Sequence, residues 1–185
     1  MHLIAKIELT EAFVISNFSC IEGSRTPKEY RSNPSRKTRE IAENTIIKKS
    51  VVSDSKIGSE VKIGPYSHIR QDSDISNKVY IGTNVEVKKS KIESGSKLGH
   101  FCYIGDSMIE KNVNIGAGTV TCNFDGKEKQ KTSILNNAFI GSGTMIVAPV
   151  IIGQNAVVGA GSVVTKDVEN DQLVYGNPAT NKKSL

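Results

Sequence analysis

Aliphatic residues recur every six positions along most of the chain, and a small residue often follows them. The series runs from Ile57 to Ile115 with two steps of five residues, and it resumes from Ile134 to Val164. Its positions are Ile57, Ile63, Ile69, Ile75, Ile81, Val87, Ile92, Leu98, Ile104, Ile109, Ile115, Ile134, Ile140, Ile146, Ile152, Val158 and Val164. This period fits neither an amphipathic helix nor a simple alternating strand. It predicts a repeat protein whose units stack on one another.

Each six-residue unit is predicted to form one short strand with its aliphatic side chain pointing inward. Glycine after the aliphatic residue, as at Gly58 and Gly99, permits the tight corners between such strands. Three strands close a triangular coil of about eighteen residues, and coils stack at roughly 4.8 Å, the spacing of paired strands. About eighteen units therefore predict an all-β parallel solenoid of about six triangular coils, stabilised by contacts between neighbouring coils.

The series divides the chain into three parts. Residues 1–44 lack it, and the basic stretch 25–39 contains Pro27 and Pro34, so we expect an irregular N-terminal arm. Residues 45–180 form the predicted solenoid, and the polar residues 181–185 form a frayed tail. The series is broken once, by residues 121–133 (TCNFDGKEKQKTS), which we interpret as an inserted loop.

Composition and charge exclude several classes of protein. The net charge of +5 is modest and no nucleic-acid-binding motif accompanies it, so nucleic acid is not an expected partner. Three cysteines are too few for a disulfide framework, and no segment resembles a membrane span or a signal peptide. These features predict a cytoplasmic protein without a membrane partner. His2, His68 and His100 are too isolated to form a zinc site, so no metal is expected.

The six-residue register predicts that Arg70 and Lys88 stack on one face of adjacent coils. Each follows an inward aliphatic residue, and the two are eighteen residues apart. Cations at one strand spacing repel each other, and a bound anion would relieve that repulsion. The alternative is a pair of solvated surface charges, and the stacking alone does not decide between the two.

Two further columns contain a histidine and small residues. His100 stacks with Ala117, and Ser142 stacks with Ala160. By the same count, the Arg70 column and these two columns lie on three different faces of the prism. One convex prism cannot gather three faces around a ligand, whereas a closed three-fold assembly brings faces of neighbouring chains together. The count therefore predicts a homotrimer with shared sites. His100 is either structural or a proton acceptor near neutral pH.

Several motifs carry a specific resemblance to one family. They are VEVKKS at 85–90, GSKLGH at 95–100, YIGD at 103–106, NVNIGAGT at 112–119, TCNFDG at 121–126, GS at 141–142 and VAP at 147–149. In residue type and spacing they resemble the acetyltransferase domain of the bifunctional N-acetylglucosamine-1-phosphate uridylyltransferase/glucosamine-1-phosphate acetyltransferase family. The resemblance covers about residues 45–168. It implies a left-handed parallel β-helix, as in other hexapeptide-repeat transferases.

The same resemblance implies an activity and roles for individual residues. The activity is transfer of acetyl from acetyl-CoA to the amine of glucosamine-1-phosphate, a step in the synthesis of UDP-N-acetylglucosamine and cell-envelope precursors, with His100 as the general base. The implied acceptor contacts are Arg70 and Lys88 at the phosphate, Tyr103 and Asn114 at the sugar, Glu86 near the amine, and Lys129 reaching from a neighbouring chain. The implied acetyl-CoA contacts are Ala117, Asn123, Phe124, Ser142, Ala160 and Asn177.

The chain departs from the family pattern in three respects. Phe124 stands where Tyr is common, which removes a hydroxyl contact to coenzyme A but keeps the ring, and Asn177 stands where some members have Arg. No uridylyltransferase domain precedes the solenoid in these 185 residues. Two alternatives therefore stay open: a hexapeptide acetyltransferase for another amino-sugar or hydroxyl acceptor, and an inactive, truncated solenoid that only assembles or binds a partner.

Overall fold

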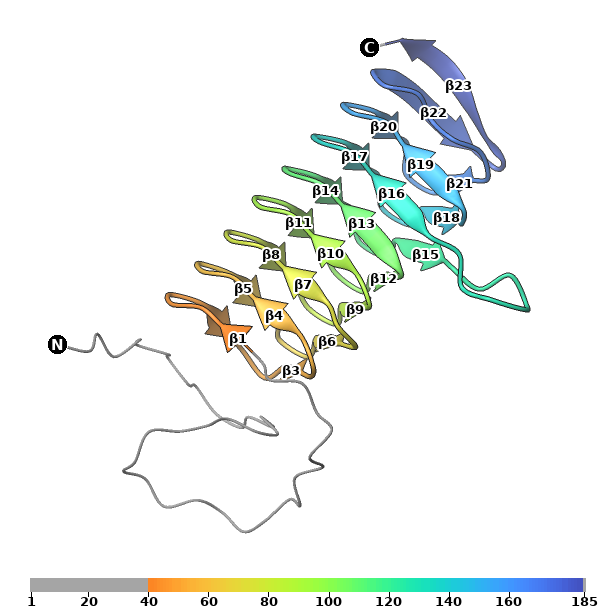
Figure 1. The fold of residues 1–185 in the computed structure, drawn as a ribbon. Helices are drawn as coiled ribbons and strands as arrows, with labels where there is room; N and C mark the ends of the chain where they lie inside the picture. The colour runs from red at the N-terminus through yellow and green to blue at the C-terminus, as the bar shows by residue number, and fades with distance from the viewer. Residues whose placement is uncertain (1–39, 185) are drawn as a thin grey trace, which may run out of the picture.

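The computed structural model describes residues 40–184 and shows a left-handed parallel β-helix (Figure 1). All regular elements in this range are β-strands, and it contains no α-helix. Strands β1 to β21 form seven coils of three strands each, and every strand pairs in parallel with its counterparts in the adjacent coils. The coils therefore build three flat sheets, here called A, B and C, in which the chain passes from A to B to C within each coil.

Sheet A contains seven strands: β1 Glu40–Ile41, β4 Lys56–Ile57, β7 Asp74–Ile75, β10 Lys91–Ile92, β13 Ser107–Ile109, β16 Thr132–Ile134 and β19 Val150–Ile152. Sheet B contains nine: β2 Ile46–Ile47, β5 Lys62–Ile63, β8 Tyr80–Ile81, β11 Lys97–Leu98, β14 Asn114–Ile115, β17 Phe139–Ile140, β20 Val157–Val158, β22 Gln172–Gly176 and β23 Ala179–Ser184. Sheet C contains seven: β3 Val51–Val52, β6 His68–Arg70, β9 Glu86–Lys88, β12 Tyr103–Gly105, β15 Val120–Cys122, β18 Met145–Val147 and β21 Val163–Val164.

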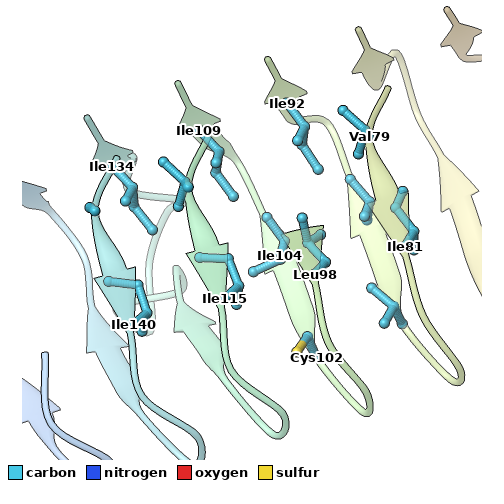
Figure 2. Close-up of a cluster of buried hydrophobic side chains, with 14 of the residues drawn as sticks. Val79, Ile81, Ile92, Leu98, Cys102, Ile104, Ile109, Ile115, Ile134 and Ile140 are labelled. Atoms are coloured by element: carbon cyan, nitrogen blue, oxygen red, sulfur yellow. The ribbon is translucent and has the colours of Figure 1, made fainter. Parts of the chain in front are cut away.

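The repeated aliphatic side chains fill the interior of the prism, as predicted. Each stacks on its counterpart in the next coil, for example Ile92 on Ile109 in sheet A and Leu98 on Ile115 in sheet B. Figure 2 shows these side chains converging from the strands into one continuous core. Twelve of the largest side chains there are less than 2% exposed. Burying each one contributes about 1.5–3 kcal/mol, so the columns hold the coils in register.

The solenoid begins and ends differently from the prediction. Strand β1 pairs with β4 and starts at Glu40, inside the range predicted as an irregular arm; the rest of that range, 1–39, lies outside the described residues. The aliphatic residues Ile41, Ile47 and Val52 already follow the repeat, with spacings of six and five residues, but none of them is followed by glycine. At the other end, β23 pairs antiparallel with β22, so residues 181–184 continue a hairpin instead of a frayed tail. There are accordingly seven coils, not six.

The inserted loop is shorter than predicted. Thr121 lies inside β15, fully buried, and pairs in register with Ile146. It occupies an inward position without being aliphatic, and its Oγ1 accepts a hydrogen bond of 2.8 Å from the Gly105 amide. This polar residue interrupts the hydrophobic series and hides the strand from the sequence pattern. The segment between the strands is residues 123–131, because β16 resumes at Thr132.

Candidate active site

The outer face of sheet C carries a cluster of polar and charged side chains. Strands β6 and β9 pair in register, so Arg70 lies beside Lys88, which confirms their predicted stacking. Strand β12 follows, with Tyr103 beside Glu86. We call Arg70, Glu86, Lys88 and Tyr103 the sheet C cluster. Farther along the same face, β15 and β18 present Val120, Cys122, Met145 and Val147 in the corresponding positions, so the polar cluster is confined to the earlier coils.

Glu86 changes the electrostatics predicted for this cluster. Its Oε1 accepts hydrogen bonds from Arg70 Nη2 at 2.6 Å and Arg70 Nε at 2.8 Å, and both side chains remain partly exposed. The carboxylate therefore already offsets the repulsion between Arg70 and Lys88, and that repulsion alone does not require a bound anion. Lys88 forms no ion pair with another described residue. The three groups together carry a net charge of +1, which still favours an anion.

Tyr103 folds back over Gly105, the residue that lies beside Lys88 in the adjacent strand. A Cβ added at Gly105 would lie 2.6 Å from the Tyr103 hydroxyl oxygen and 2.7 Å from Asn123 Nδ2. The absence of a side chain at position 105 therefore lets the tyrosine hydroxyl lie against Gly105, the strand neighbour of Lys88. The repeat pattern predicts a corner at Gly105, as at the other glycines that follow an aliphatic residue, whereas Gly105 lies within β12 and makes room for Tyr103.

Replacing Gly105 with Ala is expected to lower the free energy of unfolding by about 1–3 kcal/mol, because a methyl group there displaces the Tyr103 ring or the Asn123 amide. Thermal unfolding of the variant and of wild type measures the difference. Tyr103→Phe is the control, since it removes the hydroxyl and keeps the ring and Gly105. A Gly105→Ala protein as stable as wild type would contradict the packing described here.

His100 lies at the corner between β11 and β12, three residues before Tyr103, and its side chain is exposed. Its Nδ1 lies 3.4 Å from the Thr83 amide nitrogen, a hydrogen bond too long to fix the ring or its tautomer. The ring is thus accessible from solvent at the edge of sheet C. His68, in contrast, lies within sheet C beside Glu86, and burial together with the Arg70 charge lowers its pKa. That environment keeps His68 neutral and fits a structural residue.

The columns of small residues lie on one edge and not on separate faces, which corrects the three-face prediction. His100, Ala117, Ser142 and Ala160 each follow a sheet B strand by the same interval, at the corner between sheets B and C. The error came from the inserted loop: Ile115 pairs with Ile140, so that coil contains 25 residues, whereas the next pairing, Ile140 with Val158, spans 18. With the extra residues removed from the count, the two columns become one. Only His100, three residues before Tyr103, lies in the same coil as a member of the sheet C cluster.

The loop 123–131 leaves the opposite edge of sheet C, at the corner toward sheet A. Asn123, at its base, is 4% exposed, and its Nδ2 donates to Asp106 Oδ2 at 2.6 Å. Asp106 is itself nearly buried, with Lys89 Nζ 3.8 Å from its other oxygen. Phe124 and Lys129 lie together farther out, with Nζ 4.5 Å from the ring centroid. The base of the loop is therefore anchored by a buried polar contact to Asp106, a residue for which the motifs predicted no role.

One chain brings together only part of the predicted site. The sheet C cluster and His100 are neighbours, flanked on the other side by the loop. Asn114 is on β14, on the outer face of sheet B, and Asn177 lies in the turn between β22 and β23. Within residues 40–184, no group of His, Cys, Asp and Glu side chains is arranged to hold a metal ion. The same part of the chain contains no helix long and apolar enough to span a membrane.

Comparisons with known proteins agree with this fold. The family model described as "Bacterial transferase hexapeptide (six repeats)" matches residues 131–166. A perosamine N-acetyltransferase from Caulobacter crescentus, solved with CoA and GDP-perosamine, superposes with a TM-score of 0.56 at 23% identity, covering 76% of this chain and 57% of that one. A hexapeptide-repeat acetyltransferase from Vibrio cholerae, solved with acetyl coenzyme A, gives 0.54 at 24% identity, covering 70% of each chain. At these identities the structures show the fold alone. The match to the repeat model and the two superpositions agree on a solenoid built from hexapeptide repeats.

Over most of its length, the sequence is also similar to proteins that share one name. The protein named "Bifunctional protein GlmU" from Carboxydothermus hydrogenoformans is 53% identical over 133 residues, covering 72% of this chain and 30% of that protein. The GlmU protein of Listeria innocua is 48% identical over 133 residues, covering 72% and 29%. The chain thus spans less than a third of the length of these relatives. Its solenoid is related to one segment of GlmU, which confirms the resemblance predicted from the motifs.

Proposed function

We propose that this chain is an acetyl-CoA-dependent acetyltransferase that acetylates the amine of glucosamine-1-phosphate to give N-acetylglucosamine-1-phosphate. One observation carries the proposal: Arg70, Lys88 and Tyr103 share the outer face of sheet C, and His100 stands at the edge of that sheet, within a segment about half identical to GlmU. An anion-binding cluster next to an accessible histidine suits a phosphorylated amine as acceptor. The product would serve UDP-N-acetylglucosamine and cell-envelope precursor synthesis in the cytoplasm.

In this proposal the sheet C cluster holds the acceptor. Lys88 is the cation without an ion-pair partner among the described residues, so it would contact the phosphate directly. Arg70 would bind the phosphate with the guanidinium nitrogens that Glu86 leaves available, since a guanidinium has five N–H donors. The Tyr103 hydroxyl, held above Gly105, would contact the sugar between the phosphate and the amine.

Acetyl-CoA fits the corner column on chemical grounds. Ala117, Ser142 and Ala160 are small, and Gly118, Gly143 and Gly161 follow them, so the backbone along this edge is open to an extended ligand. The column leads to His100, where the thioester would meet the amine. The wider set proposed to contact acetyl-CoA is Ala117, Ser142 and Ala160 along this corner, Asn123 and Phe124 from the loop at the opposite edge of sheet C, and Asn177 from the turn between β22 and β23.

The proposed reaction moves one proton and one acyl group. The amine nitrogen attacks the thioester carbonyl carbon, a C–N bond forms, and the C–S bond breaks. His100 accepts the proton that the amine nitrogen loses, and the departing thiolate of coenzyme A takes up a proton. Proximity of the two reactants, together with hydrogen bonds to the developing oxyanion, would supply most of the acceleration.

A homotrimer with shared sites is part of the proposal. Its basis is no longer the three separate faces predicted from the repeat count but the positions of Asn114 and Lys129. Asn114 is on the outer face of sheet B and Lys129 lies beyond the corner toward sheet A, so neither joins the sheet C cluster of its own chain. A neighbouring chain could supply both. We expect the mass in solution, measured by light scattering, to correspond to three chains; a monomeric protein that remained active would exclude the shared site.

An acceptor panel tests the proposed function. Release of the free coenzyme A thiol is followed with glucosamine-1-phosphate, glucosamine and galactosamine, and the product is identified by mass spectrometry. The proposal predicts the highest kcat/KM with glucosamine-1-phosphate and an N-acetylated product. Preference for an unphosphorylated or hydroxyl acceptor would favour another hexapeptide acetyltransferase, and a folded trimer inactive with every acceptor would favour the inert solenoid.

A further inference from the structure

The loop 123–131 has a defined shape although it leaves the hydrophobic core. It projects from the solenoid between β15 and β16 (Figure 1), and residues 124–129 are all exposed. Even the aromatic residue Phe124 is 56% exposed. An exposed segment without buried apolar contacts would lose its conformational entropy on ordering without compensation from burial. Hydrogen bonds within the loop must therefore account for its shape.

Those hydrogen bonds converge on one side chain, Asp125. Its Oδ1 accepts from the backbone amides of Lys127 and Glu128, each at 2.8 Å. Its Oδ2 accepts from Gln130 Nε2, also at 2.8 Å. The Glu128 amide, the Gln130 side chain and the Lys127 amide, in that order, lower the pKa of Asp125 to about 2. The carboxylate is fully ionised at neutral pH and holds three donors from successive parts of the turn.

The turn closed by Asp125 brings the two ends of the loop together. The backbone amide of Asp125 donates to the Glu128 carbonyl at 3.3 Å, and the Gln130 amide donates to the Asn123 carbonyl at 2.7 Å. Phe124 and Lys129 form an antiparallel bridge across the turn, which places the Lys129 ammonium over the Phe124 ring. The relative position of these two side chains thus depends on the turn between them.

We propose that Asp125 is a positioning residue that sets the conformation of the loop before ligand arrives, so that Phe124 and Lys129 meet acetyl-CoA and the acceptor without further ordering. The inference rests on the proposed function for the roles of those two side chains. Asp125 itself touches neither reactant. Its contribution is preorganisation, which raises affinity by removing the loss of entropy that a mobile loop would suffer on binding.

Two variants of the full chain separate this role from others. Asp125→Ala removes all three acceptor contacts, whereas Asp125→Asn keeps a carbonyl oxygen that can accept both backbone amides now bound by Oδ1. Asp167→Ala is the matched control, because Asp167 is another exposed carboxylate that accepts a backbone amide, that of Ile151 at 2.8 Å, away from the loop. The readouts are hydrogen exchange of residues 123–131 on the millisecond-to-second scale, steady-state kinetics and thermal unfolding.

Asp125→Ala is expected to speed exchange in the loop and to raise KM for acetyl-CoA about tenfold, the size expected when two side chains must be ordered on binding. We expect kcat within about twofold of wild type and an unchanged Tm, because the loop lies outside the core. Asp125→Asn should have loop exchange and a KM for acetyl-CoA close to those of wild type. Asp167→Ala should change neither quantity. Unchanged loop exchange in Asp125→Ala, or faster exchange with unchanged KM, would overturn the inference. A wild-type protein inactive with every acceptor would instead refute the proposed function. The effect of Asp125→Ala on hydrogen exchange in the loop would then still test whether Asp125 sets the loop conformation.

Discussion

Replacing His100 with Ala is expected to lower kcat by about 100- to 10,000-fold, the contribution of a general base to a proton-transfer step. The side chain is exposed at the corner between β11 and β12, so its removal leaves no cavity in the core. Binding of acetyl-CoA and of the acceptor should change little. Pre-steady-state and steady-state release of coenzyme A measures kcat, and isothermal titration calorimetry measures the two affinities.

Phe101→Ala provides the control for His100→Ala. Phe101 is the next residue of the same corner and is 67% exposed, so its truncation perturbs the corner without removing a titratable group. We expect that variant to keep turnover within a few-fold of wild type. Near-normal turnover in His100→Ala would remove this histidine from the base role, and equal losses in both variants would point to the shape of the corner instead.

The second large effect is expected at Arg70, because its loss leaves Glu86 without a partner in the anion site. In wild type, Arg70 Nη2 lies 2.6 Å from Glu86 Oε1. Arg70→Met removes this cation, so the phosphate would face both the loss of a positive charge and an unpaired Glu86 carboxylate. Hydrogen bonds to charged groups are worth about 1.5–3 kcal/mol. We therefore expect KM for glucosamine-1-phosphate to rise about 10- to 100-fold, with a smaller change in kcat.

The double variant Arg70→Met/Glu86→Gln tests the electrostatic explanation. Neutralising Glu86 in the Arg70→Met background should recover part of the lost affinity, because the phosphate no longer faces an uncompensated negative charge. Unphosphorylated glucosamine is the control acceptor, since its KM should be nearly the same in both variants. A single and a double variant with the same KM for the sugar phosphate would show that Glu86 does not act on the phosphate.

The fold could be predicted from the sequence because its core repeats. Ile92, Leu98 and Ile104 each belong to a different sheet, and the same three positions recur in every coil. What the pattern could not show was a polar residue in an inward position. Thr121 is fully buried because its hydroxyl oxygen accepts the Gly105 amide, so the period disappeared at the very strand that precedes the loop.

The site was predicted in part, and its limits have a similar physical origin. The register placed Arg70 beside Lys88 correctly, since both lie in coils without insertions. It could not show that Glu86 turns its carboxylate to Arg70, because a side-chain rotamer is not encoded in a repeat period. It also separated Ser142 from His100, since the seven additional residues of the longer coil shift any uncorrected count.

The ratio of kcat/KM for glucosamine-1-phosphate to that for glucosamine tests the proposed function most directly, measured by thiol release in wild type and in Lys88→Ala. Lys88 has no ion-pair partner among residues 40–184, and its substitution leaves Glu86 bonded to Arg70. We predict a ratio well above one in wild type that falls at least about tenfold in the variant, as the loss of one charged contact to phosphate implies. A wild-type ratio near one, or a ratio that Lys88→Ala leaves unchanged, would contradict a sugar phosphate bound on sheet C.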